Sequence, residues 1–256
     1  MINRTDGQLI VFSGPSCVGK SPLAKAIARL QPELHMSLQP LVLYNSRVAR
    51  PGEMDGVDYY FRPHQEIENL KGKDGFIVMD VRGDLQALDL NELSSLLAKG
   101  NVFFEGNPFV GRVLQTHPSL AEVKRLSIFM SPLSRDEIVF LKAAKPGVSL
   151  PDIVTDVMRR KLLRRTRRQK GEVSLKDLEN IERRASSAYH ELRDAHHFQY
   201  IIPNHDGEDS ENWDAFYYPL GDARIALNAF LSLLKGEKPS GVEKWEKDLI
   251  LPKSAD

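Results

Sequence analysis

Residues 8–30, "QLIVFSGPSCVGKSPLAKAIARL", constrain the fold more than any other part of the sequence. An apolar run precedes a Gly-x4-Gly-Lys-Ser loop, and a stretch with the spacing of an amphipathic helix follows it. Such a loop turns consecutive backbone N–H groups towards one phosphate, and its glycines let the chain curl without Cβ clashes. The full eight-residue match favours a nucleoside triphosphate site over a chance glycine turn. The predicted ligand residues are Gly14, Pro15, Ser16, Cys17, Val18, Gly19, Lys20 and Ser21.

Within this loop, Lys20 is expected to neutralise the β and γ phosphates, and the Ser21 hydroxyl to ligate Mg²⁺. Pro22 has no N–H to offer the α phosphate, which predicts modestly weaker nucleotide binding. Cys17 is the one cysteine of the chain and excludes an intramolecular disulfide. Its place near a helix N-terminus could lower the thiol pKa, but we favour the simpler interpretation of a small side chain tolerated in the loop.

The rest of the chain alternates between strand-like and helix-like segments. Short apolar runs such as "PLVLYN", "GFIVMDV", "NVFFEG", "RLSIFM" and "FQYIIPN" predict buried strands, and "DLNELSSLLAKG", "SRDEIVFLKAA" and "DARIALNAFLSLL" predict helices. This alternation predicts an α/β fold with a parallel sheet covered by helices on both faces, as in P-loop NTPases. The 256 residues suffice for one such domain with insertions.

Composition excludes several classes of function. The 35 basic and 35 acidic residues leave no net charge, so we expect no general attraction to nucleic acid or anionic lipid. No apolar run approaches the roughly 20 residues of a membrane-spanning helix, and the N-terminus lacks a signal-like segment. We therefore expect a cytoplasmic protein with no membrane partner.

Residues 44–61, "YNSRVARPGEMDGVDYYF", follow neither a helical nor a strand period. This stretch resembles the acceptor-binding signature of guanylate kinases, and the matching positions are Arg47, Arg50, Glu53, Gly56, Asp58, Tyr59 and Phe61. Weaker resemblances in "RLSIFMSPLSRDEI" and "NIERRASSAYHEL" extend the similarity over residues 8–234. By this resemblance the partner is a small phosphorylated acceptor, GMP or a similar molecule, and the donor is ATP with Mg²⁺.

The resemblance implies that Arg47, Arg50 and Tyr59 hold the acceptor phosphate and that Glu53 orders the two arginines. Guanidinium groups suit this task because they bind phosphate oxygens in pairs. The resemblance also implies a domain over residues 1–235. Its expected parts are a core of 1–43, 91–149 and 193–235, an inserted acceptor-binding subdomain of 44–90 and an extended helical lid of 150–192. A tail of 236–256 is expected to pack loosely or to reach a partner through Trp245, Leu249 and Ile250.

The half of the family's acceptor site that recognises guanine is not matched. Val78 stands where the base-reading glutamate is expected, Leu43 stands near the position of an early serine, and Asp80 is a conceivable substitute. Where the family has an Asp-x-Asp pair, this chain has Glu105 and Asn107, which we expect to contact the acceptor, with Glu105 also near Mg²⁺. Loss of several base contacts would remove strong selectivity for guanine.

The segment "RRKLLRRTRRQK", residues 159–170, holds eight basic residues. By the resemblance it belongs to a lid whose arginines stabilise the transferring phosphoryl group. The candidate catalytic residues are Lys20, Arg164, Arg168, Arg183 and Arg184, and Asn204 is expected near the adenine. Binding of RNA to this segment is a rival interpretation, but no aromatic residues are interleaved with the arginines.

These observations predict ATP-dependent phosphoryl transfer to a nucleoside monophosphate, with GMP as the acceptor that the resemblance implies. One alternative is a P-loop kinase for another phosphorylated acceptor, such as a different nucleotide or a sugar phosphate. Another is a catalytically weak binding module of the same fold. The sequence leaves the oligomeric state open.

Overall fold

The structure is a computed structural model that describes residues 7–50, 52–144 and 149–250. The chain divides into two compact units. The first comprises Met1–Val11 and Met36–Leu126, and the second comprises Phe12–His35 and Ser127–Asp256.

The larger sheet has the strand order β2-β7-β1-β8-β9. β2 pairs with β7 in parallel, and β8 pairs with β9 in parallel. The apolar runs that predicted β1, β7, β8 and β9 are confirmed, and the side chains of β1 are all buried. The run at 40–45 is not one strand, because only Pro40 belongs to β2 and residues 44–45 form a strand of the other sheet. Its strands are β1 (Leu9–Ser13), β2 (Gln39–Pro40), β7 (Val102–Gly106), β8 (Arg125–Ser131) and β9 (Tyr200–Pro203).

A second sheet of four strands lies in the first unit, with the order β4-β3-β6-β5. The predicted strand at 75–81 belongs here and not to the parallel sheet, because it turns back on itself as an antiparallel hairpin. Arg82 and Gly83 form the turn, and both have positive φ angles, 60° and 87°, as a tight two-residue hairpin requires. The strands are β3 (Tyr44–Asn45), β4 (Tyr60–Phe61), β5 (Phe76–Val81) and β6 (Asp84–Asp89).

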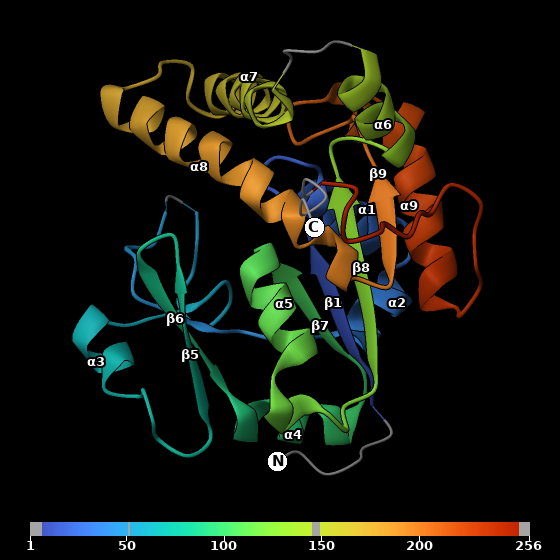
Figure 1. Ribbon diagram of the computed structural model, residues 1–256. Coiled ribbons are helices and arrows are strands. Elements are labelled where there is room, and N and C mark those ends of the chain that lie inside the picture. The colour runs from blue at the N-terminus through green and yellow to red at the C-terminus, as the bar shows by residue number, and fades with distance from the viewer. Residues whose placement is uncertain (1–6, 51, 145–148, 251–256) are drawn as a thin grey trace, which may run out of the picture. The chain divides into compact units, whose positions relative to one another are not determined.

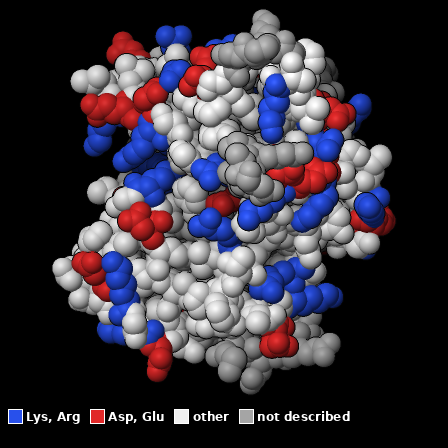
Figure 2. Space-filling model, viewed as in Figure 1, with Lys and Arg blue, Asp and Glu red and all other residues white. Residues whose placement is uncertain are grey.

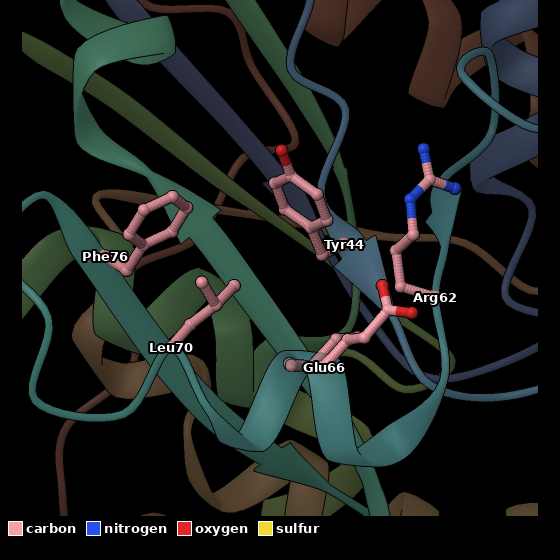
Figure 3. A pocket seen from close by; sticks show the side chains of 6 residues that line it. Tyr44, Arg62, Glu66, Leu70 and Phe76 are labelled. Carbon is pink, nitrogen blue, oxygen red and sulfur yellow. The ribbon is translucent and has the colours of Figure 1, made fainter.

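One face of this second sheet packs on the short helix α3 (His64–Glu68). Ile67 of α3 forms a buried cluster with Leu85 and Ala87 of the sheet, and Tyr44 and Val78 pack against it. Figure 3 shows the small pocket at this face. Its lining residues are Tyr44, Arg62, Glu66, Ile67, Leu70 and Phe76. We call this face the α3 face.

Two further helices of the first unit begin at polar caps. The Asp89 carboxylate accepts the backbone N–H groups of Asn91 and Glu92 at the start of α4 (Leu90–Lys99), which the sequence predicted. The Asn107 side chain accepts the N–H of Phe109 at the start of α5 (Pro108–Thr116), which the sequence analysis did not predict. α5 contacts β5. The helix α2 (Pro32–Ser37) precedes β2.

The second unit holds the long helices. α7 and α8 pack along each other as a helical hairpin (Figure 1). A capping box between Ser174 and Asp177 starts α8. Among the described residues, no helix is both long and apolar enough to span a bilayer. The helices are α1 (Lys20–Leu30), α6 (Arg135–Ala144), α7 (Leu150–Lys170), α8 (Leu175–Arg193) and α9 (Gly221–Leu234).

The described part of the C-terminal tail, residues 236–250, does not pack loosely. Glu243 forms an antiparallel bridge with Ile201 of β9, and Trp245, Leu249 and Ile250 are buried. The Lys142 ammonium donates to the Leu249 carbonyl at 2.8 Å. The tail's apolar side chains are thus part of the second unit's interior, which corrects the expectation that they pack loosely or reach for a partner. Residues 251–256 lie outside the described residues.

We expect Trp245→Ala to lower the free energy of unfolding by about 3–5 kcal/mol, because it empties the space of a side chain that is 3% exposed. Equilibrium unfolding in urea measures this change. Lys247→Ala, an exposed position two residues on, is the control and should change stability by no more than about 0.5 kcal/mol. Equal effects of the two substitutions would show that the tail is not held as described.

Candidate active site

The phosphate loop, residues 14–21, has the strained backbone that its glycines allow. Gly14 and Gly19 have φ angles of 154° and 110°. A Cβ atom on Gly14 would lie 2.4 Å from the Met130 carbonyl oxygen, and one on Gly19 would lie 2.6 Å from Asn204 Nδ2. Neither position has room for a side chain, so the loop requires glycine at both.

Lys20 is folded back onto this loop. Its side chain is buried, and its ammonium donates to the carbonyls of Gly14 and Pro15 at 2.7 and 2.9 Å. These bonds hold a positive charge within the loop's own curve, where a phosphate would be bound. Ser21 follows in the first turn of α1 and is exposed. Pro22 also lies in the first turn, where its missing N–H leaves no intrahelical bond unmade.

Cys17 is an inert residue. Burial, followed by the negative charge of Glu208, raises the pKa of its thiol to about 12, so the reactive thiolate does not form at neutral pH. The Cys17 side chain is fully buried, and its backbone φ angle of 67° belongs to the turn of the loop. The structure therefore favours the small tolerated side chain over the reactive cysteine.

Asn204, expected near an adenine, instead clamps the phosphate loop. It is fully buried, and its Nδ2 donates to the Val18 carbonyl at 2.8 Å and to the Asp206 carbonyl at 2.6 Å. Its Oδ1 accepts the Asp206 N–H at 3.2 Å. Because both donors and the acceptor are engaged inside the protein, the structure does not support a direct contact with a base.

One predicted lid arginine reaches the phosphate loop. Arg184 of α8 donates through Nε to the Ser16 hydroxyl at 3.0 Å. Its neighbour Arg183 is exposed. Arg164 and Arg168 of α7 are exposed as well, and they lie 3.7 and 3.4 Å from the carboxylates of Asp209 and Asp214. Of the predicted arginines, only Arg184 is brought against the loop within the second unit.

The sequence analysis missed Arg165. Its guanidinium pairs with Glu208 at 2.6 Å, and both side chains are about 15% exposed. Burial acts to raise the pKa of Glu208, but the charges of Arg165, Lys20 and Arg184 outweigh it and hold this pKa below its usual value. Glu208 is therefore a shielded carboxylate whose charge is balanced by Arg165, Lys20 and Arg184, at or near the phosphate loop. A run of arginines does not reveal which one faces inward, and nothing in the resemblance pointed to Glu208.

The basic segment 159–170 is largely neutralised by its surroundings. Seven of its eight basic residues form ion pairs with nearby carboxylates, and Arg167 is the exception among the described residues. Figure 2 shows acidic and basic side chains interspersed over the region of α7 and α8. An RNA backbone would meet paired charges here, which argues against the nucleic-acid interpretation. The paired residues are Arg159, Arg160, Lys161, Arg164, Arg165, Arg168 and Lys170.

We expect Glu208→Gln to lower the free energy of unfolding by about 3 kcal/mol, because Arg165 would keep a largely buried charge without its counter-ion. The double substitution Glu208→Gln with Arg165→Met should cost less than Glu208→Gln alone. Urea unfolding of the four proteins measures the coupling. Arg160→Met, in an exposed pair with Asp156, is the control and should cost at most about 1 kcal/mol. Additive effects at 165 and 208 would contradict the pairing.

The residue after the clamp, His205, links two helices. Its Nδ1 lies 2.5 Å from the Asp222 carboxylate of α9, and its Nε2 lies 2.9 Å from the Glu137 carboxylate of α6. Burial acts to lower the pKa of His205, but these two hydrogen bonds outweigh it and the pKa is raised. A histidine between two carboxylates is most stable as the imidazolium, which donates from both nitrogens.

The stabilisation from His205 should therefore depend on pH. A folded pKa above the unfolded value of about 6.5 means that the contribution is fully present below that pH and is lost as the pH rises through the folded pKa. We expect the stability advantage of the wild type over His205→Gln to shrink as the pH rises above about 6.5, as followed by urea unfolding. Asp222→Asn should flatten this dependence. An advantage that grows with pH would contradict the assignment.

The residues predicted to hold the acceptor phosphate lie in the first unit and are arranged around a carboxylate. The Glu53 oxygens accept from both terminal nitrogens of Arg47, at 2.6 and 2.7 Å, and one of them also accepts the Arg50 N–H at 2.8 Å. Burial acts to raise the pKa of Glu53, but these bonds outweigh it and the pKa is lowered. Glu53 thus orders both arginines, the role that the resemblance implied for it.

Aromatic rings support the same arginine. The Arg47 guanidinium lies 5.1 Å from the ring centre of Tyr59 and 5.3 Å from that of Phe61. Burial raises the pKa of the Tyr59 phenol, which therefore stays a neutral donor. The charge of Glu105, at the end of β7, also acts on this phenol. The geometry suits a phosphate held by a guanidinium and a phenol.

Other matched positions of the signature shape its loop. Gly56 has a φ angle of 76°, and Asp58 accepts the Met54 N–H at 2.8 Å. These two residues form the turn between Glu53 and Tyr59. They position the residues predicted to bind phosphate, and no described feature of the structure makes Gly56 or Asp58 itself a ligand.

Two predicted substrate residues have structural roles. Asp80 is exposed at the end of β5, on the α3 face with Val78, and its carboxylate accepts the Gly83 N–H of the hairpin turn at 2.9 Å. The structure therefore does not support Asp80 as a substitute for the base-reading glutamate. Asn107 uses its side-chain oxygen to cap α5.

No protein-built metal cage exists among the residues the structure describes, since no three His, Cys, Asp or Glu side chains gather in a suitable group. The hydroxyl of Ser21, in the second unit, and the carboxylate of Glu105, in the first, are each by themselves groups of a kind that can ligate Mg²⁺.

Comparison with known proteins places these features in a family context. Residues 6–98 match the family model described as "Guanylate kinase". A guanylate kinase of Symbiobacterium thermophilum is 30% identical over 157 residues, which is 60% of this chain and 70% of that protein. One from Synechococcus sp. is 29% identical over 219 residues, 84% of each chain. The crystal structure of guanylate kinase from Anaplasma phagocytophilum shares the fold, with a TM-score of 0.52, 17% identity, and coverage of 92% of this chain and 88% of that one.

Proposed function

Because this chain belongs to the guanylate kinase family, we propose that it is an ATP-dependent kinase that transfers a phosphoryl group to a nucleoside monophosphate, with GMP as the first acceptor to test. The observation that supports this proposal is that the chain has two sets of groups whose chemistry suits phosphate binding. One is the phosphate loop with Lys20, and the other is the arginine pair ordered by Glu53. A phosphotransferase needs one set for the donor and one for the acceptor.

The proposed roles follow from the chemistry of each group. The backbone N–H groups of residues 14–21 and the Lys20 ammonium would bind the ATP phosphates, and Arg184, already at Ser16, would neutralise charge on the transferring group. Arg165 would add to this positive field once Glu208 no longer neutralises it. Mg²⁺, when bound, would supply positive charge to the phosphates, and the Ser21 hydroxyl at the start of α1 is suited to hold it. Arg164, Arg168 and Arg183 remain candidates that only a substrate-bound state would recruit.

On the acceptor side, Arg47, Arg50 and Tyr59 would hold the acceptor's phosphate. Glu105 and Asn107, which the sequence analysis assigned to the acceptor, would lie close to that phosphate. No side chain needs to act as a strong base, because positioning and charge stabilisation supply most of the rate in phosphoryl transfer. A kinase for another phosphorylated acceptor uses the same groups, and a weak binding module would retain the loop without turnover.

We expect ADP to form from Mg·ATP only when a phosphorylated acceptor is present, and Lys20→Ala to lower kcat by at least about 100-fold. Coupled detection of ADP with a panel of nucleoside and sugar monophosphates measures both. Lys25→Ala, an exposed lysine on the same helix, is the matched control and should leave the rate unchanged. Turnover of one acceptor far above the others identifies the substrate, and absence of acceptor-dependent ADP with every acceptor would favour the binding module.

Arg47→Ala should raise the KM for the acceptor by about 10- to 100-fold and leave the KM for ATP within a factor of about two, because the guanidinium is assigned to the acceptor phosphate alone. Arg62→Ala is the control, since Arg62 lines the pocket on the α3 face. Equal changes in both KM values on loss of Arg47 would argue against a separate acceptor half.

A further inference from the structure

A row of side chains crosses the four-stranded sheet on the face opposite to α3. Asn45 of β3 is paired with Phe61 of β4 on one side and with Gln86 of β6 on the other, and Gln86 is paired in turn with Met79 of β5. Directly paired residues project from the same face of a sheet. Phe61, Asn45, Gln86 and Met79 therefore form one continuous row, here called the acceptor row.

The phosphate-binding end of this row is fixed by Arg47. Its guanidinium lies 5.3 Å from the ring centre of Phe61, the first member of the row. Adjacent strands are about 4.8 Å apart, so Asn45 and Gln86 follow at about 5 and 10 Å along the row. A molecule whose phosphate is held at Arg47 and which extends along the row therefore brings its remaining part over these two carboxamides.

The carboxamides of Asn45 and Gln86 each have hydrogen-bonding groups that the described part of the protein does not engage. Asn45 and Gln86 are 1% and 6% exposed. The Asn45 oxygen accepts the Arg47 N–H at 3.1 Å, which leaves its NH₂ group without a partner in the described part of the chain. The Gln86 carboxamide has no hydrogen-bond partner there either. Polar side chains as buried as these usually have a hydrogen-bond partner in the protein. Neither carboxamide is among the described polar atoms that are fully buried without a partner, so its spare groups stay within reach of solvent. Because both lie in the same row as Phe61, against which Arg47 packs, these groups point to a ligand bound along the row.

We infer that Gln86, assisted by Asn45, contacts the group attached to the acceptor's phosphate, and that this group is a neutral nucleobase edge with one donor beside one acceptor. This inference rests on the proposed function and deepens it. A carboxamide offers one oxygen and one NH₂ side by side, so it matches such an edge in two hydrogen bonds. The N1–H and 2-amino groups of guanine are two donors, which need two acceptors. The acceptor row contains no carboxylate, so the 2-amino group is not read by it.

The discriminating experiment compares GMP with IMP, which differ only in that 2-amino group, and with ribose 5-phosphate, which has no base. We expect GMP and IMP to have values of kcat/KM within about threefold of each other. Gln86→Leu should lower kcat/KM for both nucleotides by about 5- to 150-fold, the effect of one to two lost hydrogen bonds, and should leave ribose 5-phosphate unchanged. Gln86→Glu, which supplies a second acceptor, should create a preference for GMP over IMP.

Gln65→Leu is the matched control, because Gln65 is an exposed glutamine on α3 whose side chain donates to Asn69 of the same segment. A wild-type preference for GMP over IMP of tenfold or more would overturn the inference, since another residue would then read the 2-amino group. So would a Gln86→Leu variant that changes all three acceptors alike or none of them. If Gln86→Leu does not fold, the ratio of kcat/KM for GMP to that for IMP, measured for the wild type and for Gln86→Glu, still tests the inference.

Calorimetric titration of IMP and of ribose 5-phosphate without ATP separates this inference from the proposed function. If no acceptor yields ADP but Gln86→Leu weakens the binding of IMP and not that of ribose 5-phosphate, the kinase proposal fails and Gln86 keeps its assigned role. If ADP forms and Gln86→Leu leaves IMP binding unchanged, the kinase stands and the inference fails.

Discussion

The carboxamide of Asn204 joins the phosphate loop to the segment that follows β9, and we call this pair of hydrogen bonds the Asn204 junction. The geometry of the predicted donor half of the site depends on it. It ties the Val18 carbonyl of the phosphate loop to the Asp206 carbonyl of the segment that follows β9. Two buried hydrogen bonds of this kind contribute about 1 kcal/mol each, but leaving them unmade would cost more, because buried carbonyl groups would lose their partners. The close approach also explains why Gly19 has no space for a side chain.

The same junction sets the position of Glu208. Asp206 is held by hydrogen bonds from Ser210, Asn212 and the Ala223 N–H, so the segment between β9 and α9 has a fixed start. Glu208 lies within this segment and is thereby held against Arg165. An exposed loop carboxylate would gain little from such a pair, whereas this one is shielded from solvent, where the interaction of opposite charges is stronger.

Both halves of the site hold their cations with an internal carboxylate. Glu53 orders Arg47 and Arg50 in the first unit, and Glu208 pairs with Arg165 in the second. A carboxylate keeps the guanidinium groups in place before a ligand arrives, which lowers the entropy lost on binding. It also competes with the incoming phosphate for the same N–H groups. Bidentate pairing leaves Arg47 fewer donors for phosphate. In the function proposed above, Arg50 and Tyr59 would therefore have to supply part of the contacts to the acceptor phosphate.

The sequence could predict the position of a residue where the spacing of residues along the chain alone decides which way its side chain points. It could not do so where tertiary packing decides that direction. The turn of the phosphate loop was predictable from its glycine spacing, because local backbone rules place it. Arg47, Arg50 and Glu53 were predicted from the resemblance to guanylate kinases, which supplied their order along the chain. Arg165 was not, because arginines occupy several faces of α7 and only packing selects the inward one. The burial of Trp245 was missed for a related reason, since turn residues and mixed charge around it resemble a loose tail.

Asp80 and Gln86 show the limit most clearly, because in a strand a shift of one residue moves a side chain to the opposite face. Position counting made Val78 and Asp80 the counterparts of a base-reading group, and the pairing of β5 with β6 turns both towards α3. The hairpin that fixes this register turns at Arg82 and Gly83, a pair that carries a weaker turn signal than Asn-Gly. Once the register is known, Gln86 and Asn45 follow as the polar groups that share a face with Phe61, and Arg47 lies against the Phe61 ring at the end of that row.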